Sequence, residues 1–296
     1  MEFGFQRFGT GIGVEFYLKV LEITSLHTIL VLGAYLMTGL TGLFSLGQGA
    51  FLSIGAYTAA ISYLYFHVPF PLAVLLAVLV GSLVGFLIGI PVLRLHRDYF
   101  LLVTFGFSEM VRATLLHLAQ LTGGALGIAG IPKLVGLPTI LASILFITFL
   151  IFNLKRSRFG RNCIAIRDDE LAASVMGINV YGHKMKVFIL SSAITSYGGA
   201  LYAFVIMFIE PNLFHWLESG KLIVITFIGG VNSITGAIMI SVAYYSFGEF
   251  FRFVDVWRDV LLSVAVLLVT IFRPKGIFGS WELSLTKLFA RREKGR

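Results

Sequence analysis

The amino-acid sequence predicts an all-α fold, a polytopic transmembrane helical bundle, and three observations lead to it. Hydrophobic side chains make up 57% of the 296 residues and charged ones only 13%, well below the share usual in soluble domains. No Asp, Glu, Lys or Arg occurs between Glu22 and Arg94, a stretch far longer than the roughly 20 apolar residues that one helix needs to cross a bilayer. The apolar blocks do not alternate with polar residues as barrel strands do, so helices are expected.

Apolar blocks of helical length predict eight or nine spans within a single transmembrane domain, residues 1–296. The expected spans are 18–37, 49–66, 72–93, 98–120, 135–153, 186–208 and 259–273, with a shorter, glycine-interrupted pair at 221–229 and 234–251. Gly81, Gly85 and Gly89 recur at four-residue steps and form one strip of a helix. A neighbouring backbone can approach such a strip closely.

The positive charges lie in two polar segments, and their placement predicts the topology. One is the segment 154–185 and the other follows the last span and includes the tail 280–296. By the positive-inside rule both segments should be cytoplasmic, so 154–185 is expected to be a cytoplasmic loop and 280–296 a cytoplasmic basic tail. The net charge of +8 is thereby explained by membrane topology, and no nucleic-acid partner is expected.

Two stretches interrupt the helices with glycines and small polar residues. The first contains Gly42, Ser45, Gly47, Gln48 and Gly49, and the second contains Gly229, Gly230, Asn232 and Ser233. They share a loose Gly-x-x-Ser pattern, so the bundle is expected to have Gly-broken helices and inverted repeats. Broken segments at matching places in two halves indicate a translocation path in transporters. Two unrelated packing points would explain the same pattern.

The charged stretch RDDELAASVMGIN, residues 167–179, predicts a short helix within the cytoplasmic loop. Asp168 is placed to cap it, Asp169 and Glu170 favour its first turn, and Gly177 ends it. A helix of about two turns is marginal unless something packs on it. The apolar residues fall at helical spacing and form one face: Leu171, Ala172, Val175 and Met176. Two interpretations remain open, docking to a soluble partner or lying on the lipid headgroups.

A charged pair lies inside a predicted span. Glu109 and Arg112 come roughly a dozen residues into the span that begins near Asp98, which places them near the middle of the membrane. Ionisable residues there are costly and usually face the protein interior in pairs, and the three-residue spacing allows this pair. One interpretation is a polar element beside a substrate path or gate, and the other is a structural ion pair that holds helices in register.

The longest motif, GRNCIAIRDDELAASVMGINVYGHKMKVFILSSAITSYGGALYA, resembles the cytoplasmic loop and following helix of a known family. This family comprises the membrane subunits of bacterial ABC importers for branched-chain amino acids, and the likeness is to its LivM-like side. Four further motifs resemble the same family in the right order, between residues 28 and 279. They are LRLHRDYFLLVTFGFSEMVR at 93–112, TGGALGIAGIP at 122–132, FIGGVNSITGA at 227–237 and FRPKGIFG at 272–279.

The resemblance implies which residues contact a partner. Permeases of ABC importers carry an E-A-A-x-x-x-G loop that contacts the ATPase, and Ala172, Ala173 and Gly177 match it, while Leu171 stands in the place of the Glu. The implied ATPase contacts are Arg167, Asp168, Asp169, Glu170, Leu171, Ala172, Ala173 and Gly177. The path residues expected from the two broken stretches and the charged pair are Gly42, Ser45, Gly47, Gln48, Gly49, Glu109, Arg112, Gly229, Gly230, Asn232 and Ser233.

The resemblance also implies an assembly in a bacterial inner (cytoplasmic) membrane, which the chain crosses several times. The sequence has no G-x-x-x-x-G-K-[ST] phosphate loop, so ATP and Mg²⁺ are expected on two separate ABC ATPase subunits and no cofactor in this chain. The other implied partners are membrane lipid, a second homologous permease as a heterodimer partner, and an extracytoplasmic substrate-binding protein. The expected role is a transport subunit, not an enzyme, that imports branched-chain or other small hydrophobic amino acids.

Three alternatives stay open at this point. Related permeases serve amides or urea, so an amide or urea ABC permease is one. An ion-coupled secondary transporter is the second, because such proteins also use broken helices and repeats. The third is a membrane enzyme that uses His96, Asp98 and Glu109 at the inner face, although these residues lack a metal-type spacing.

Overall fold

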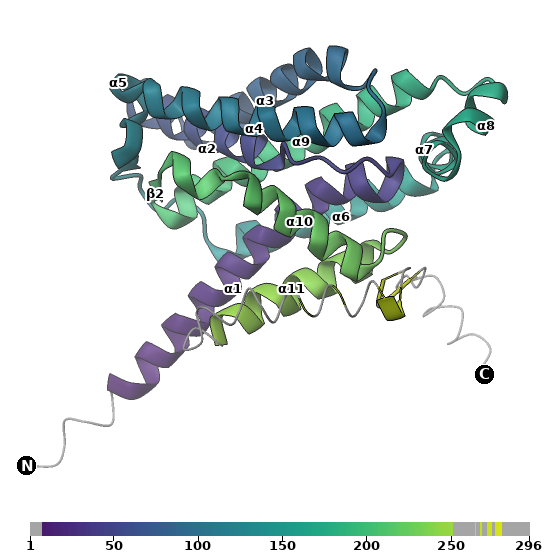
Figure 1. The fold of residues 1–296 in the computed structure, drawn as a ribbon. Helices are drawn as coiled ribbons and strands as arrows, with labels where there is room; N and C mark the ends of the chain where they lie inside the picture. Colours follow the sequence, from purple (N-terminus) through teal and green to yellow (C-terminus); the bar gives the residue numbers. More distant parts are fainter. Residues whose placement is uncertain (1–7, 251–263, 265–266, 268–270, 274–275, 280–296) are drawn as a thin grey trace, which may run out of the picture.

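The computed structural model describes residues 8–250, 264, 267, 271–273 and 276–279, which form a helical bundle with one short sheet (Figure 1). The first half contains α1 (Phe8–Tyr35), the π-helical turn η1 (Leu36–Thr41), α2 (Gln48–Leu64), α3 (Phe70–Val92), α4 (Arg97–His117), α5 (Ala119–Thr122), the 3-10 turn η2 (Gly124–Leu126) and β1 (Ile128–Ala129). The second half contains α6 (Leu137–Arg156), α7 (Arg158–Asp168), α8 (Glu170–Val175), α9 (Val180–Ile206), β2 (Phe208–Ile209), the 3-10 turn η3 (Pro211–Phe214), α10 (Trp216–Gly229) and α11 (Ile234–Phe250).

The predicted all-α bundle is confirmed, and helices occupy the positions of the expected spans as far as Phe250. Five stretches of the described residues are long and apolar enough to cross a membrane: Phe16–Thr41, Phe70–Val92, Arg97–His117, Leu137–Arg156 and Val180–Ile206. The shorter α2, α10 and α11 correspond to 49–66, 221–229 and 234–251. The predicted span 259–273 lies largely outside the described residues, and the tail 280–296 lies entirely outside them.

Helix α9 lies at the centre of the bundle, with its largest contacts to α2, α3 and α1. The predicted glycine strip is confirmed on α3, because Gly81 faces Ser196 and Gly85 faces Ser192 of α9. Both serines are fully buried, and their hydroxyl groups donate to backbone carbonyls, Ser196 to Phe51 O at 2.9 Å. Small residues therefore bring α2, α3 and α9 together closely enough for side chain to backbone hydrogen bonds between helices.

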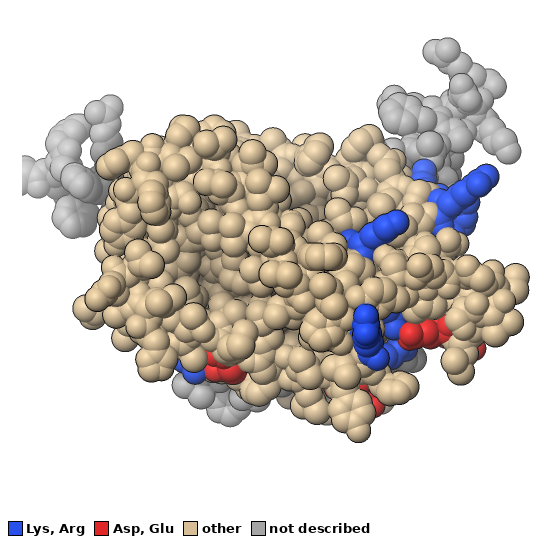
Figure 2. Space-filling view, turned by 90° about the horizontal axis from the view of Figure 1, so that it is seen from above, with Lys and Arg blue, Asp and Glu red and all other residues tan. Residues whose placement is uncertain are grey.

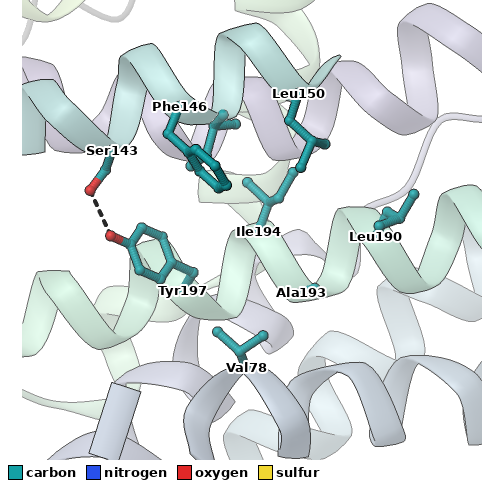
Figure 3. A pocket seen from close by; sticks show the side chains of 9 residues that line it. Val78, Ser143, Phe146, Leu150, Leu190, Ala193, Ile194 and Tyr197 are labelled. Atoms are coloured by element: carbon teal, nitrogen blue, oxygen red, sulfur yellow. Dashed lines mark hydrogen bonds between the residues drawn. The ribbon is translucent and has the colours of Figure 1, made fainter. Parts of the chain in front are cut away.

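The outer faces of α3 and α6 are apolar and exposed, as expected for helices that meet lipid. Leu79, Leu83, Leu145 and Phe149 are each more than half exposed. Between α3, α6 and α9 lies a hollow of about 320 Å³, shown in Figure 3. The side chains that line it are apolar except for Ser143 and Tyr197, whose hydroxyl groups form a hydrogen bond of 2.6 Å. Among the described residues, the lining of this hollow has no charged side chain.

The two ends of the bundle differ in charge. At one end β1 and β2 pair antiparallel, with Ile128 opposite Ile209, and α5 lies nearby (Figure 1). At the other end lie α7 and α8, and Figure 2 shows that most of the visible Lys and Arg side chains gather there. The asymmetry agrees with the charge pattern from which the topology was predicted.

The Cys163 thiol is expected to resist alkylation in the folded protein. It is fully buried in α7, which is not one of the candidate spans, and burial raises the pKa of this thiol to about 12. Since the thiolate is the reacting form, maleimide labelling at mildly alkaline pH should be slow. Labelling should become fast once the protein is unfolded in dodecyl sulfate. Equal rates in the folded and unfolded protein would contradict this prediction.

Candidate functional site

The short helix α8 begins with a side-chain cap, but not the predicted one. Asp169 Oδ1 accepts a hydrogen bond from Ala172 N at 2.9 Å, and Asp169 is the residue with extended backbone. The prediction that Asp168 caps the helix is therefore wrong. Asp168 is the last residue of α7, and its carboxylate accepts a hydrogen bond from Arg167 Nε at 3.1 Å. The N-cap is the non-helical residue directly before a helix, and because α7 includes Asp168, that residue is Asp169.

The predicted end of the α8 helix at Gly177 is confirmed. Gly177 has φ +79°, the left-handed conformation that glycine adopts without a Cβ penalty. Its N–H donates to Ser174 O at 3.0 Å, and Ile178 N donates to Ala173 O at 3.1 Å. These two bonds satisfy carbonyls that the short helix leaves free, so the turn is closed without help from another chain.

One face of α8 points away from the rest of the molecule. Leu171, Val175 and Met176 are 79%, 86% and 81% exposed, whereas Ala173 is 4% exposed and packs inward. Figure 1 shows α8 at the edge of the bundle, beyond the ends of α6 and α9. Three large apolar side chains on one exposed turn form a surface that is suited to contact with another molecule.

An ion pair joins α8 to the central helix. Glu170 Oε1 lies 2.7 Å from Lys184 Nζ, which belongs to the first turns of α9. The Lys184 side chain is only 5% exposed, so it has little access to water, and Glu170 supplies the charge that it needs. A displacement of α8 is therefore resisted by the buried end of α9.

Arg167 joins α7 to the first helix break. Its Nη1 donates to Gly39 O of η1 at 2.7 Å, and its own carbonyl accepts from Arg97 Nη2 at 2.8 Å. Its stem packs on Gly42, where an added Cβ would lie 2.6 Å from Arg167 Cγ. Arg167 thus contacts both sides of the point at which the first transmembrane helix ends, and it is adjacent in sequence to the segment that carries α8.

The first predicted break is confirmed between η1 and α2. Gly42 has φ +67° and turns the chain, and residues 43–47 have no helical structure. The Leu46 N–H donates to Thr104 Oγ1 of α4 at 3.1 Å, and the Gly47 N–H donates to Ser45 Oγ at 3.3 Å. Backbone groups freed by the break are therefore satisfied by small hydroxyl groups, which is what an interruption inside a membrane requires.

Gln48 is buried at the start of α2 and holds a cluster of hydroxyl groups. Its Nε2 donates to Ser191 Oγ at 2.9 Å, and its Oε1 accepts from Thr195 Oγ1 at 2.6 Å. Ser191 in turn donates to Gly33 O at 2.7 Å. The Gln48 amide is thus satisfied by α9, and in this conformation it connects α2 with α9. Its predicted role in the path remains a prediction.

The second predicted break is confirmed between α10 and α11. Gly230 has φ +110°, and the chain re-enters a helix at Ile234, where Ser233 Oγ accepts from Gly236 N at 2.9 Å. Lys155 Nζ, at the end of α6, donates to Asn232 O and, at 3.3 Å, to Tyr35 OH. Each break therefore has a carbonyl that accepts from a cation of the α6–α7 region, Arg167 in one case and Lys155 in the other.

Glu109 and Arg112 form the predicted pair. Glu109 Oε2 accepts from Arg112 Nε at 2.9 Å and lies 2.8 Å from Nη2. The pair is not fully buried, because the two side chains are 27% and 26% exposed. Arg112 Nη1 also donates to Asn212 Oδ1 at 3.3 Å, and His215 Nε2 lies 3.8 Å from Glu109 Oε1. The pair thus connects α4 with η3 and with the start of α10.

Four polar residues of these sites were not singled out from the sequence. Lys155 and Lys184 lie in the basic segment 154–185 from which the topology was predicted, and Arg97 directly precedes the expected span 98–120. The partner of Lys184 is 14 residues away in the chain, and that of Lys155 is 77 residues away. No short-range sequence pattern predicts contacts between residues so far apart in the chain. Asn212 was also overlooked, although an Asn beside Glu210-Pro211 in a turn gave a weak polar signal.

The whole membrane region matches one family model. The family is described as the permease component of the branched-chain amino acid transport system, and residues 16–271 match it. The chain belongs to this family. The permease is 32% identical to the high-affinity branched-chain amino acid transport system permease protein LivM of Escherichia coli strain K12, over 87% of this chain and 69% of that protein.

A more distant similarity extends to the other permease type of the same transport system. The chain is 24% identical to the permease protein LivH of Salmonella typhimurium, over 88% of this chain and 93% of LivH. No solved structure matches this permease. The family and the apolar helices together identify a multi-pass membrane protein of the ABC-importer permease type.

Proposed function

We propose that this permease is one of two transmembrane subunits of an ATP-driven importer in the inner membrane, and that it moves branched-chain amino acids, or other small hydrophobic ones, into the cytoplasm. The proposal rests on the α8 knob, which we define as the exposed residues Leu171, Val175 and Met176. It also rests on the contacts that join α8 and the end of α7 to the transmembrane helices. An apolar knob fixed to the bundle can transmit a push, whereas a loose one cannot.

The knob is fixed at two places. The Glu170–Lys184 ion pair ties α8 to α9, and the Arg167–Gly39 hydrogen bond ties the end of α7 to η1. Closure of two ATPase subunits would push on α8, and the ties would pass the displacement to α9 and to the first helix break. ATP and Mg²⁺ belong to those subunits, and this chain contributes transport and no hydrolysis.

The remaining partners follow from the relatives. LivM and LivH are both named as permease proteins of one transport system, so the second transmembrane subunit is a LivH-like chain and the pair is a heterodimer. A substrate-binding protein would deliver the amino acid at the β1–β2 end. The path between the two permeases is assigned to the helix breaks at 42–49 and 229–233 and to Glu109 and Arg112.

Replacing Val175 with Asp is expected to detach the ATPase subunits and abolish uptake. A carboxylate in the middle of the apolar knob would be desolvated without a partner, which costs about 1–3 kcal/mol or more. The measurement is co-purification of the ATPases with the permease pair, followed by ATP-dependent leucine uptake in proteoliposomes. Leu126→Asp is the matched control for attachment of the ATPases, because Leu126 is 85% exposed and lies in η2, near the other end of the bundle.

The outcomes separate the alternatives. Unchanged attachment of the ATPases to Val175→Asp would contradict docking and would favour a helix that lies on headgroups. Leucine uptake by the purified chain alone, driven by an ion gradient without ATP, would favour a secondary transporter. ATP-dependent uptake of an amide or urea, but not of leucine, would assign the chain to that type of importer.

A further inference from the structure

We infer that a pocket between the end of α3 and the start of α9 binds the phosphate group of an anionic phospholipid. The pocket, called the α3–α9 end pocket below, has a volume of about 410 Å³, within the roughly 300–1,000 Å³ of small-molecule sites. It lies at the α8 end of the bundle, where most of the Lys and Arg side chains visible in Figure 2 gather. Its lining consists of Leu93, Arg94, Glu170, Val180, Tyr181 and Lys184.

The α3–α9 end pocket lies at the depth of lipid headgroups. The candidate span of α3 is Phe70–Val92, and Arg94 comes two residues after its end. The candidate span of α9 begins at Val180, so Tyr181 is its second residue. A helix of 23 residues, as in α3, is about 34 Å long, slightly more than the roughly 30 Å of a hydrocarbon core. The two span ends that form the pocket therefore lie where the phosphates of one leaflet lie.

Arg94 supplies an available positive charge. It is exposed, and no carboxylate of the described residues lies within ion-pair distance of its guanidinium group. Its closest aromatic contact is the ring of Tyr181, whose centroid lies 5.7 Å from the central guanidinium carbon. A guanidinium group can bind a phosphate through two parallel hydrogen bonds, so Arg94 is suited to a phosphate ligand.

The other two charges that line the pocket neutralise each other. Lys184 Nζ lies 2.7 Å from Glu170 Oε1, and the Lys184 side chain is only 5% exposed, so we do not count it as a donor for the ligand. The lining thus has two cations and one carboxylate, and the excess positive charge is that of Arg94. A basic pocket at the membrane surface favours an anionic headgroup over a zwitterionic one.

An exposed apolar row on α3 leads to the pocket and offers a surface to the lipid chains. Leu83, Leu87 and Ile90 are all exposed, and their spacing of four and three residues places them on one helix face. Arg94 follows Ile90 by four residues, and the Tyr181 hydroxyl donates to Ile90 O at 3.3 Å. A phospholipid with its phosphate at Arg94 can lay a chain along this row. A soluble anion would make no contact with it.

The α3–α9 end pocket is separate from the exposed α8 knob. None of the knob residues lines the pocket, although Glu170, the first residue of α8, does. A lipid in the pocket would lie against the Glu170–Lys184 ion pair, which joins α8 to α9. A protein docked on the knob can therefore leave the pocket open to the membrane.

Lipid binding to the permease assembly, measured by native mass spectrometry, tests the pocket. The assembly is purified in detergent and titrated with phosphatidylglycerol, and the dissociation constant of the first bound lipid is determined. Arg94→Gln should raise this constant about tenfold, because a charge-assisted hydrogen bond is lost. Arg158→Gln is the matched control, since Arg158 is exposed in the first turn of α7 and does not line the pocket. Its constant should equal that of the unmodified protein.

A second measurement separates lost binding from lost folding. Arg94 is exposed and lies outside the span, so Arg94→Gln should have the same thermal unfolding midpoint as the unmodified protein when no lipid is added. Phosphatidylglycerol should raise the midpoint of the unmodified protein and of Arg158→Gln by mass action. It should raise the midpoint of Arg94→Gln less.

Two competitors identify the source of the phosphate. Phosphatidylcholine has the same phosphate but no net charge, so it should bind about fivefold more weakly than phosphatidylglycerol. Inorganic phosphate has no acyl chain, and at the same concentration as the lipid it should not displace phosphatidylglycerol.

Each of four results would overturn the inference. They are an unchanged affinity in Arg94→Gln, an equal loss in Arg158→Gln, displacement of the lipid by inorganic phosphate, and equal binding of the two phospholipids. Binding that occurs only after the ATPase subunits have been removed would also overturn it and would assign the pocket to an acidic side chain of a partner. The measurements involve no transport, so failure of the proposed function would not change their outcome.

Discussion

Arg167→Met is expected to uncouple ATP hydrolysis from uptake while the ATPase subunits stay attached. Methionine keeps much of the apolar stem that packs on Gly42 but cannot donate to Gly39 O, so the tie between α7 and η1 is lost and the knob of α8 is not altered. A hydrogen bond from a charged donor contributes about 1.5–3 kcal/mol, so leucine imported per ATP should fall about tenfold or more.

Arg161→Met provides the control for the uncoupling experiment. Arg161 lies in the same helix, is exposed, and donates to Arg156 O at 2.8 Å, which does not involve a transmembrane break. The measurement is the ratio of leucine uptake to phosphate release in proteoliposomes, with ATPase attachment checked by co-purification. A ratio equal to that of the unmodified protein in Arg167→Met would show that the tie does not transmit the push.

Gly55→Val is expected to prevent the bundle from forming. Gly55 lies where α2 crosses α9, and an added Cβ would overlap the carbonyl group of Ser196, a backbone atom that cannot move aside. The same crossing is tight from the other side, because a Cβ on Gly199 would overlap Leu52 O. The cost should exceed the roughly 1–3 kcal/mol of ordinary overpacking, because two helix backbones must separate.

The measurement for this variant is the yield of monodisperse protein in detergent and its thermal unfolding midpoint. Gly220→Ala is the matched control, since a Cβ added in α10 at that position meets no atom within 4 Å. Alanine there should leave stability unchanged or raise it by about 0.5–1 kcal/mol, because glycine weakens a helix interior. Normal yield and an unchanged midpoint for Gly55→Val would contradict the α2–α9 packing.

The two helix breaks explain why a small set of cations matters at one end of the molecule. A broken helix leaves carbonyl groups without an intrahelical donor, and the negative end of its dipole attracts positive charge. Arg167 meets this need at Gly39 of η1, and Lys155 donates to the carbonyl of Asn232 in the turn between α10 and α11. The same cations that orient the protein by the positive-inside rule are therefore also structural contacts of the transmembrane helices.

The sequence by itself determined the class of fold, the positions of the helices as far as Phe250, the two breaks and the glycine end of α8. Each of these depends on local chemistry: apolar length sets a span, a glycine permits a left-handed turn, and a strip of glycines on one helix face allows close packing. The pairing of Glu109 with Arg112 could be predicted for the same reason, because residues three apart in a helix are neighbours.

Only the tertiary structure decided which groups act together across the chain. It moved the cap of α8 from Asp168 to Asp169, because α7 continues through Asp168 and Asp169 is the non-helical residue between the two helices. It joined Arg167 to Gly39, residues 128 apart, and turned Gln48 toward α9. Contacts of this kind depend on how the helices cross. The crossing geometry results from the packing of whole helix faces, so a short sequence pattern does not determine it.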